Sequence, residues 1–170
     1  MSKFITFKPI GELLKEADLI TSPQLEVALR DQTYNEDMRL GEILALRGWI
    51  KQDTADFFVQ EWFKLINQRV AHPIGFYLKR AGLLTEQDIR LILAQQHNYA
   101  LRFGDTAVQQ GLIKPKTIDF FLQNLFPSQL YRERLKIKER QQQQTEQITR
   151  EDITFWASLS SKKLTEHKSV

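Results

Sequence analysis

The 170-residue chain contains no cysteine and no run of about 18 apolar residues. The lack of cysteine excludes a disulfide framework and any thiolate metal or redox site. The first eight residues, Met1 to Lys8, lack the apolar stretch of a signal peptide. We therefore expect a soluble cytoplasmic protein with no transmembrane segment.

Motifs for catalysis are missing as well. The sequence has no Gly-x-x-x-x-Gly-Lys-Ser/Thr phosphate loop, no Gly-x-Ser-x-Gly, and no plausible Ser/His/Asp order. The three histidines, His72, His97 and His167, show no metal-ligand spacing. We therefore predict a protein that is not an enzyme, with no catalytic residue, no bound metal and no cofactor.

Charge of one sign does not dominate most of the chain. Residues 1–126 carry fifteen basic and fifteen acidic side chains, and residues 127–170 carry nine and six, which gives the net charge of +3. A large basic face for a nucleic acid backbone is not indicated, so we expect no DNA partner. Nucleic-acid binding through the basic C-terminal tail is a weaker alternative.

Glycine is scarce, yet its placement organises the chain. All seven glycines occupy two slots of a 24-residue pattern that occurs four times between residues 9 and 125. The first slot holds Gly11, Gly41, Gly75 and Gly104, and the second holds Asp18, Gly48, Gly82 and Gly111. Aspartate also tolerates left-handed backbone angles, so all four second slots are expected to end a helix.

Apolar residues after each second slot lie four apart, about one helical turn, and so share a helix face. These pairs are Leu25 and Leu29, Ala55 and Val59, Ile89 and Leu93, and Ile118 and Leu122. Thr21 with Gln24 resembles a capping box, Thr85 with Asp88 is a weaker relative, and Pro115 suits a first helical turn. The pattern predicts long helices at about 22–32, 52–68, 86–99 and 115–125.

The four units form a duplicated pair, because units one and three begin with proline and units two and four with arginine. We predict an all-α fold of short-helix and long-helix hairpins in two related four-helix halves, residues 1–66 and 67–126. Residues 63–72 contain no glycine, proline or serine, which favours a continued helix between packed halves. Residues 127–170 are predicted to be a polar tail, partly helical or disordered.

The spacing of arginine, glycine, leucine and glutamine resembles the MshEN-type domain, found at the N-terminus of assembly ATPases of type II secretion and type IV pilus systems. Some members of that family bind cyclic di-GMP, and the resemblance covers residues 9–125 as two divergent copies without the ATPase. It implies a protein partner, such as a pilus or secretion assembly ATPase, that would hold the protein at the inner face of the membrane. The ligand residues it implies are Gln32, Arg39, Gly41, Gln96, Arg102 and Gly104.

An arginine fork matches O6 and N7 of guanine, which makes the implied ligand chemically sensible. Half of the family's polar signature is replaced here, because Pro9 and Pro73 fill arginine slots and Trp62 and Leu125 fill glutamine slots. Two function classes therefore stay open. One is a regulatory module that is either cyclic di-GMP-responsive or ligand-free and partner-binding, and the other is a purely structural protein–protein adaptor that binds no nucleotide.

Aromatic residues gather around the second unit, at Trp49, Phe57, Phe58, Trp62 and Phe63. Part of this cluster is predicted to form either an exposed partner surface or the interface between the halves. In the tail, residues 153–159 form a short apolar island that either docks a partner or folds back onto the repeats. The residues assigned to partner binding are Trp49, Phe58, Trp62, Phe155 and Trp156.

Overall fold

The computed structural model describes residues 8–68, 70–99, 102–128, 135–147, 150–151 and 153–154, with the side chains of 97–99 left out. The described residues form helices and contain no β-strand, so the all-α prediction is confirmed. The chain divides into two compact units, Met1–Pro127 and Ser128–Val170.

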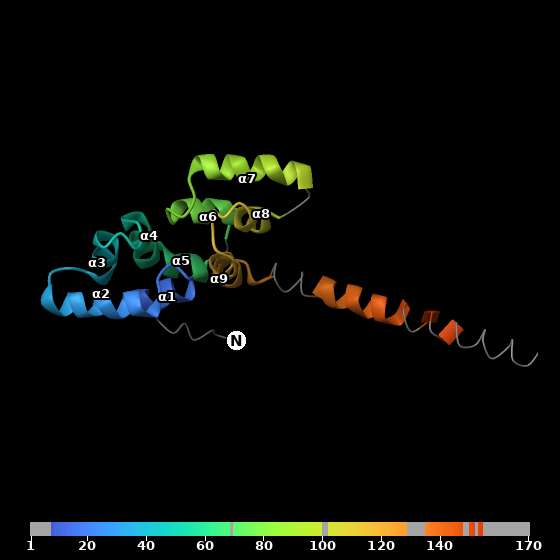
Figure 1. Ribbon diagram of the computed structural model, residues 1–170, viewed down its shortest axis with the longest axis horizontal. Helices are drawn as coiled ribbons and strands as arrows, with labels where there is room; N and C mark the ends of the chain where they lie inside the picture. The colour runs from blue at the N-terminus through green and yellow to red at the C-terminus, as the bar shows by residue number, and fades with distance from the viewer. Residues whose placement is uncertain are drawn as a thin grey trace, which may run out of the picture. The chain divides into compact units, whose positions relative to one another are not determined.

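In the described part of the first unit, short helices of seven residues alternate with longer helical segments (Figure 1). The short helices are α1 (Ile10–Glu16), α3 (Leu40–Leu46), α6 (Ile74–Arg80) and α8 (Phe103–Gln109). The longer segments are α2 (Ser22–Tyr34), α4 (Gln52–Asp56) continued by the π-helix η1 (Phe57–Glu61) and α5 (Trp62–Asn67), α7 (Glu86–Tyr99) and α9 (Pro115–Leu125).

Each short helix is closed by one residue in the left-handed region. The φ angles are 57° at Asp18, 70° at Gly48, 67° at Gly82 and 68° at Gly111. Aspartate adopts this conformation at lower cost than most residues with a Cβ atom, so Asp18 ends its helix as the glycines do. The predicted use of the second slot as a helix stop is therefore confirmed at all four positions.

The long helices begin where the caps predict. The Thr21 N–H donates to Gln24 Oε1 at 2.7 Å, and the Gln24 N–H donates to Thr21 Oγ1 at 3.3 Å, which is a complete capping box. At the start of α7, the N–H and hydroxyl of Thr85 both donate to Asp88 Oδ2 at 2.7 Å. Pro115 is the first residue of α9.

The continued helix predicted for residues 63–72 is wrong in its second part. Helix α5 ends at Asn67, and Gln68 is extended, with φ −111° and ψ 160°. Pro73 disfavours helical angles in the residue before it. The hydroxyl of buried Tyr77 accepts the N–H groups of Ala71 and His72, both at 3.3 Å, and so satisfies this extended segment.

Aromatic rings from the two halves meet in the core. Trp62 stacks on Phe120 with a centroid separation of 4.9 Å and an interplanar angle of 14°. Phe57 stacks on Phe121 at 6.1 Å, and Phe58 lies 6.2 Å edge-on from Phe121. Helix α9, which carries Phe120 and Phe121, packs against both α1 and α5 (Figure 1). The rings therefore join the first half to the second.

The assignment of Phe58 and Trp62 to an exposed partner surface is wrong. Phe58 is 0% exposed and Trp62 is 1% exposed, so neither ring reaches a partner. The physical reason is that Phe120 and Phe121 of the second half provide the opposite wall for both rings. These side chains belong to the interface between the halves, the second of the two places considered for the cluster.

Two buried threonines connect the halves reciprocally. Thr54 Oγ1 donates to the Ala81 carbonyl at 2.8 Å, and Thr117 Oγ1 donates to the Ala17 carbonyl at 2.7 Å. The second unit thus bonds to the turn of the third, and the fourth unit bonds to the turn of the first. Each bond satisfies a buried hydroxyl that would otherwise cost free energy.

In the second compact unit, residues 135–147 are helical, and every described side chain there is exposed. The predicted helical character of the tail is confirmed for this stretch. Phe155 and Trp156, assigned to partner binding, lie outside the described residues. Among the described residues, the helices are too short or too polar for any of them to traverse a lipid bilayer.

Candidate functional site

Gln32 and Arg39, the predicted ligand pair of the first half, lie at the two ends of one loop. Gln32 is half-buried near the end of α2, and its Nε2 donates to the Met38 carbonyl at 3.2 Å. The exposed Arg39 follows directly and caps α3, and its N–H donates to Glu42 Oε2 at 2.7 Å. Gln32 therefore supports the backbone that presents the Arg39 guanidinium.

An apolar side chain is exposed beside this pair. Leu29 lies three residues before Gln32 on α2 and remains 47% exposed, although Leu25, one turn earlier, is buried. Leu93, at the same slot of the second half, is 48% exposed. The core thus does not bury Leu29 or Leu93 fully. Each leucine can therefore contact a ligand or a partner protein.

Gln96 and Arg102 are the corresponding pair of the second half. Gln96 is half-buried on α7, and Arg102 is exposed at the start of α8. Both residues take part in interactions within the structure. The Arg102 carbonyl also accepts the Thr106 hydroxyl at 3.0 Å. The second half therefore keeps the same placement of glutamine and arginine on consecutive helices.

Gly41 and Gly104, also assigned to the ligand, have a clear packing role. A Cβ atom on Gly41 would lie 2.8 Å from Ala55 Cβ, and one on Gly104 would lie 2.9 Å from Ile118 Cγ2. Real Cβ atoms do not approach so closely. Glycine at these two positions therefore allows each short helix to touch the long helix that follows it, whatever the ligand.

Trp49 was also assigned to partner binding. Its side chain is half-buried, and a cation–π contact holds its ring. The Arg47 guanidinium lies 5.1 Å from the centroid of its ring and forms an ion pair with Asp31. The hydrogen bond from Arg47 lowers the pKa of Asp31 below its ordinary value, and the same bond raises the pKa of Arg47. The ion pair and the cation–π contact together fix the Trp49 ring on the surface of the first half.

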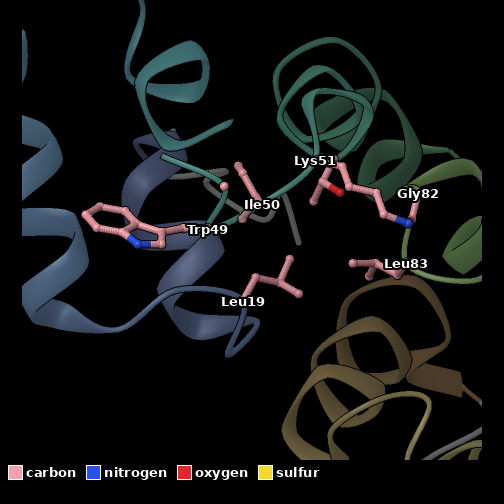
Figure 2. A pocket seen from close by; sticks show the side chains of 8 residues that line it. Leu19, Trp49, Ile50, Lys51, Gly82 and Leu83 are labelled. Carbon is pink, nitrogen blue, oxygen red and sulfur yellow. The ribbon is translucent and has the colours of Figure 1, made fainter. Parts of the chain in front are cut away.

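A cleft of about 440 Å³ lies where the first half meets the second. Figure 2 shows Leu19 and Leu83 pointing toward each other and the Lys51 side chain reaching Gly82, while the Trp49 ring points away. Lys51 Nζ donates to the Gly82 carbonyl at 2.9 Å. The remaining lining residues are Gly48, Ile50 and Thr54. None of the predicted ligand residues lines this cleft.

A smaller cleft of about 190 Å³ shares Leu19 and Leu83 with the first. It contains Lys114, whose Nζ donates to the Asp18 carbonyl at 2.8 Å and lies 3.4 Å from Asp18 Oδ2. Sequence reasoning missed both clefts. The sequence signal for them is a lysine at the same slot of units two and four, Lys51 and Lys114, three residues after the second-slot glycine.

Comparison with known proteins finds a relative of this chain. An uncharacterized protein of the cyanobacterium Picosynechococcus is 45% identical over 120 residues, which cover 68% of this chain and 63% of that relative. The chain thus spans less than two thirds of the relative's length. No protein-family model matches the chain, and no solved structure matches it.

Proposed function

We propose that the protein is a non-catalytic regulatory or adaptor protein whose two MshEN-like halves bind cyclic di-GMP and respond to it beside a pilus or secretion assembly ATPase. The observation that carries this proposal is the exposed leucine at one slot of both halves, Leu29 and Leu93. Each occurs on the helix that also carries the glutamine, and the arginine begins the next helix. An exposed apolar side chain and a guanidinium carried by consecutive helices suit a purine base.

The chemistry divides between these side chains. The arginine fork donates to guanine O6 and N7, while the leucine packs against the face of the base. In the first half Gln32 positions the loop through the Met38 carbonyl, so its contribution is to hold Arg39 in place. The two halves would each supply one such arginine, which fits a ligand with two guanines.

Isothermal titration of the full chain with cyclic di-GMP tests this function. Arg39→Ala and Arg102→Ala should each weaken binding by about ten-fold or more, the loss expected for one bidentate base contact. Arg30→Ala, which removes an exposed arginine of α2 that is not assigned to the ligand, is the matched control and should bind like the wild type. The absence of heat at concentrations well above micromolar would remove the nucleotide from the proposal.

The alternative is a structural adaptor that binds a protein and no nucleotide. The favouring observation is the apolar end of α3, where Leu46 is 77% exposed, three residues before the half-buried Trp49. Under this alternative, Leu46→Asp should abolish capture of a purified pilus assembly ATPase, whereas Arg39→Ala should leave capture unchanged. Loss of residues 153–159 tests the tail in the same assay, with the melting temperature as the control for folding.

A further inference from the structure

The two clefts between the halves are internal copies of each other. Lys114 follows Lys51 by 63 residues, and Gly82 follows Asp18 by 64, which are the offsets of the repeat. Both lysines bond to the carbonyl of the left-handed residue opposite, at 2.9 Å in one cleft and 2.8 Å in the other. The backbone of the two sites is therefore built in the same way.

The side chain at the left-handed residue distinguishes the two clefts. Asp18 places a carboxylate oxygen 3.4 Å from the Lys114 ammonium, and the ion pair occupies one cleft. Gly82 has no side chain to offer Lys51. The cleft at Lys51 is correspondingly larger, about 440 Å³ compared with about 190 Å³. One cleft thus contains its own carboxylate, and the other has the lysine and the space without it.

The carboxylates near Lys51 do not form an ion pair with its ammonium group in the described part of the chain, so the ammonium can pair with the carboxylate of a ligand. In the described part of the chain, no carboxylate oxygen lies within 4.0 Å of Lys51 Nζ. Lys51 acts on Asp88 electrostatically, but the Asp88 carboxylate is bonded to Thr85. Asp53 lies near Gly82, because a Cβ atom added to Gly82 would be 3.3 Å from the Asp53 Cβ. The Asp53 side chain is exposed to solvent.

We propose that the Lys51 cleft binds the carboxylate of an external ligand, in the place that Asp18 takes beside Lys114. The apolar side chains of Leu19, Ile50 and Leu83 line the cleft and receive a short aliphatic body attached to that carboxylate. A small carboxylic acid and the C-terminal residue of a partner protein share this chemistry. None of the residues assigned to cyclic di-GMP takes part, so this site is independent of the proposed function.

A titration of the full ¹⁵N-labelled chain with hexanoate tests the site, with the Gly82 amide signal as the reporter and the Gly111 signal as the internal reference. We expect a saturable shift of the Gly82 signal with hexanoate and none with hexanamide, which has the same shape without the charge. Lys51→Met should weaken binding about ten-fold or more, the loss of one charged hydrogen bond. Lys114→Met is the matched control and should leave the affinity unchanged.

Equal shifts with hexanamide, or equal losses in the two lysine variants, would overturn the proposal. A shift that stays linear in hexanoate concentration without saturating would also overturn it. To identify the source of the carboxylate, acetyl-Gly-Leu with a free C-terminus is compared with its amide. Tighter binding of the free dipeptide than of hexanoate assigns the cleft to a protein C-terminus, and the reverse order assigns it to a small acid.

Exchanging the left-handed residues gives a second, independent test. Gly82→Asp should place a carboxylate beside Lys51 and abolish hexanoate binding, because aspartate adopts this backbone conformation at position 18. Asp18→Gly should open a second hexanoate site at Lys114, seen as a new saturable shift of the amide signal of Leu112, which lines that cleft. A wild-type response of both variants, at unchanged melting temperature, would show that the carboxylate exchange has no role.

Discussion

Single atoms at the first-slot glycines decide how closely the helices approach. A Cβ on Gly41 would meet Ala55 Cβ at 2.8 Å, which can move only with its backbone. A Cβ on Gly11 would meet Leu25 Cδ1 at 2.5 Å, the end of a flexible side chain. The shorter contact is therefore the easier one to relieve.

We expect Gly41→Ala to lower the free energy of unfolding by about 1–3 kcal/mol, the usual cost of overpacking. Gly11→Ala should cost less, because Leu25 can change rotamer. Urea denaturation of both variants measures the difference. Equal costs would show that the flexibility of the contacted side chain does not distinguish the two glycines.

Residue chemistry explains which predictions from the sequence held. Asp18 was recognisable as a helix stop because few residues tolerate positive φ. This tolerance depends only on the residue's own side chain. The burial of Phe58 and Trp62 was not recognisable, because it depends on Phe120 and Phe121, which lie about sixty residues further along the chain. Position within a helix does not indicate which distant ring will cover it.

At the scale of elements, the cap of α7 depends on a titratable group and the cap of α2 does not. The hydroxyl and the N–H of Thr85 donate to the Asp88 carboxylate and lower its pKa from the ordinary 3.8. At α2 the equivalent acceptor is the amide of Gln24, which carries no charge at any pH used. The two helices therefore form a matched pair.

Because the pKa of Asp88 is lower in the folded state, its contribution to stability is present above pH 3.8 and is lost as the pH falls through the folded value. Amide hydrogen exchange followed between pH 5 and pH 2 should show the first turn of α7 loosening while that of α2 does not. Asp88→Asn should remove this difference in pH dependence. Equal loosening of both helices in the wild type would contradict the assignment.

The starts of the capped helices were predictable to within a residue, because a capping side chain lies next to the first helical turn in the sequence. The end of α5 at Asn67 was harder. The segment after it is extended because Tyr77 accepts its N–H groups, and that contact comes from a later helix. The cleft at Lys51 was missed for the same reason, since its opposite wall belongs to the third unit.

At the scale of the whole first unit, the shared aromatic core should make both halves unfold together. Trp62→Ala removes the ring that stacks on Phe120, and we expect a loss of about 3–5 kcal/mol in the free energy of unfolding. Hydrogen exchange should accelerate by the same factor in α2 and in α9. Phe76→Ala, at a ring that is 38% exposed, is the control and should have a much smaller effect.

Unequal acceleration, confined to the first half, would mean that the halves are separable folding units. The reciprocal bonds of Thr54 and Thr117 argue for one cooperative transition, because each half closes a turn of the other.

The bond from Thr117 to the Ala17 carbonyl joins residues that are 100 positions apart. Closing so long a loop has an entropic cost, and the bond cannot form before both residues are present. During synthesis on the ribosome, the turn at Ala17 therefore waits for nearly the whole first unit to emerge. The bond from Thr54 to Ala81 spans only 27 positions and can form much earlier. The two equivalent bonds thus form at different stages of synthesis, Thr54 to Ala81 early and Thr117 to Ala17 late. Between these stages, the turn after α1 stays uncovered in the nascent chain.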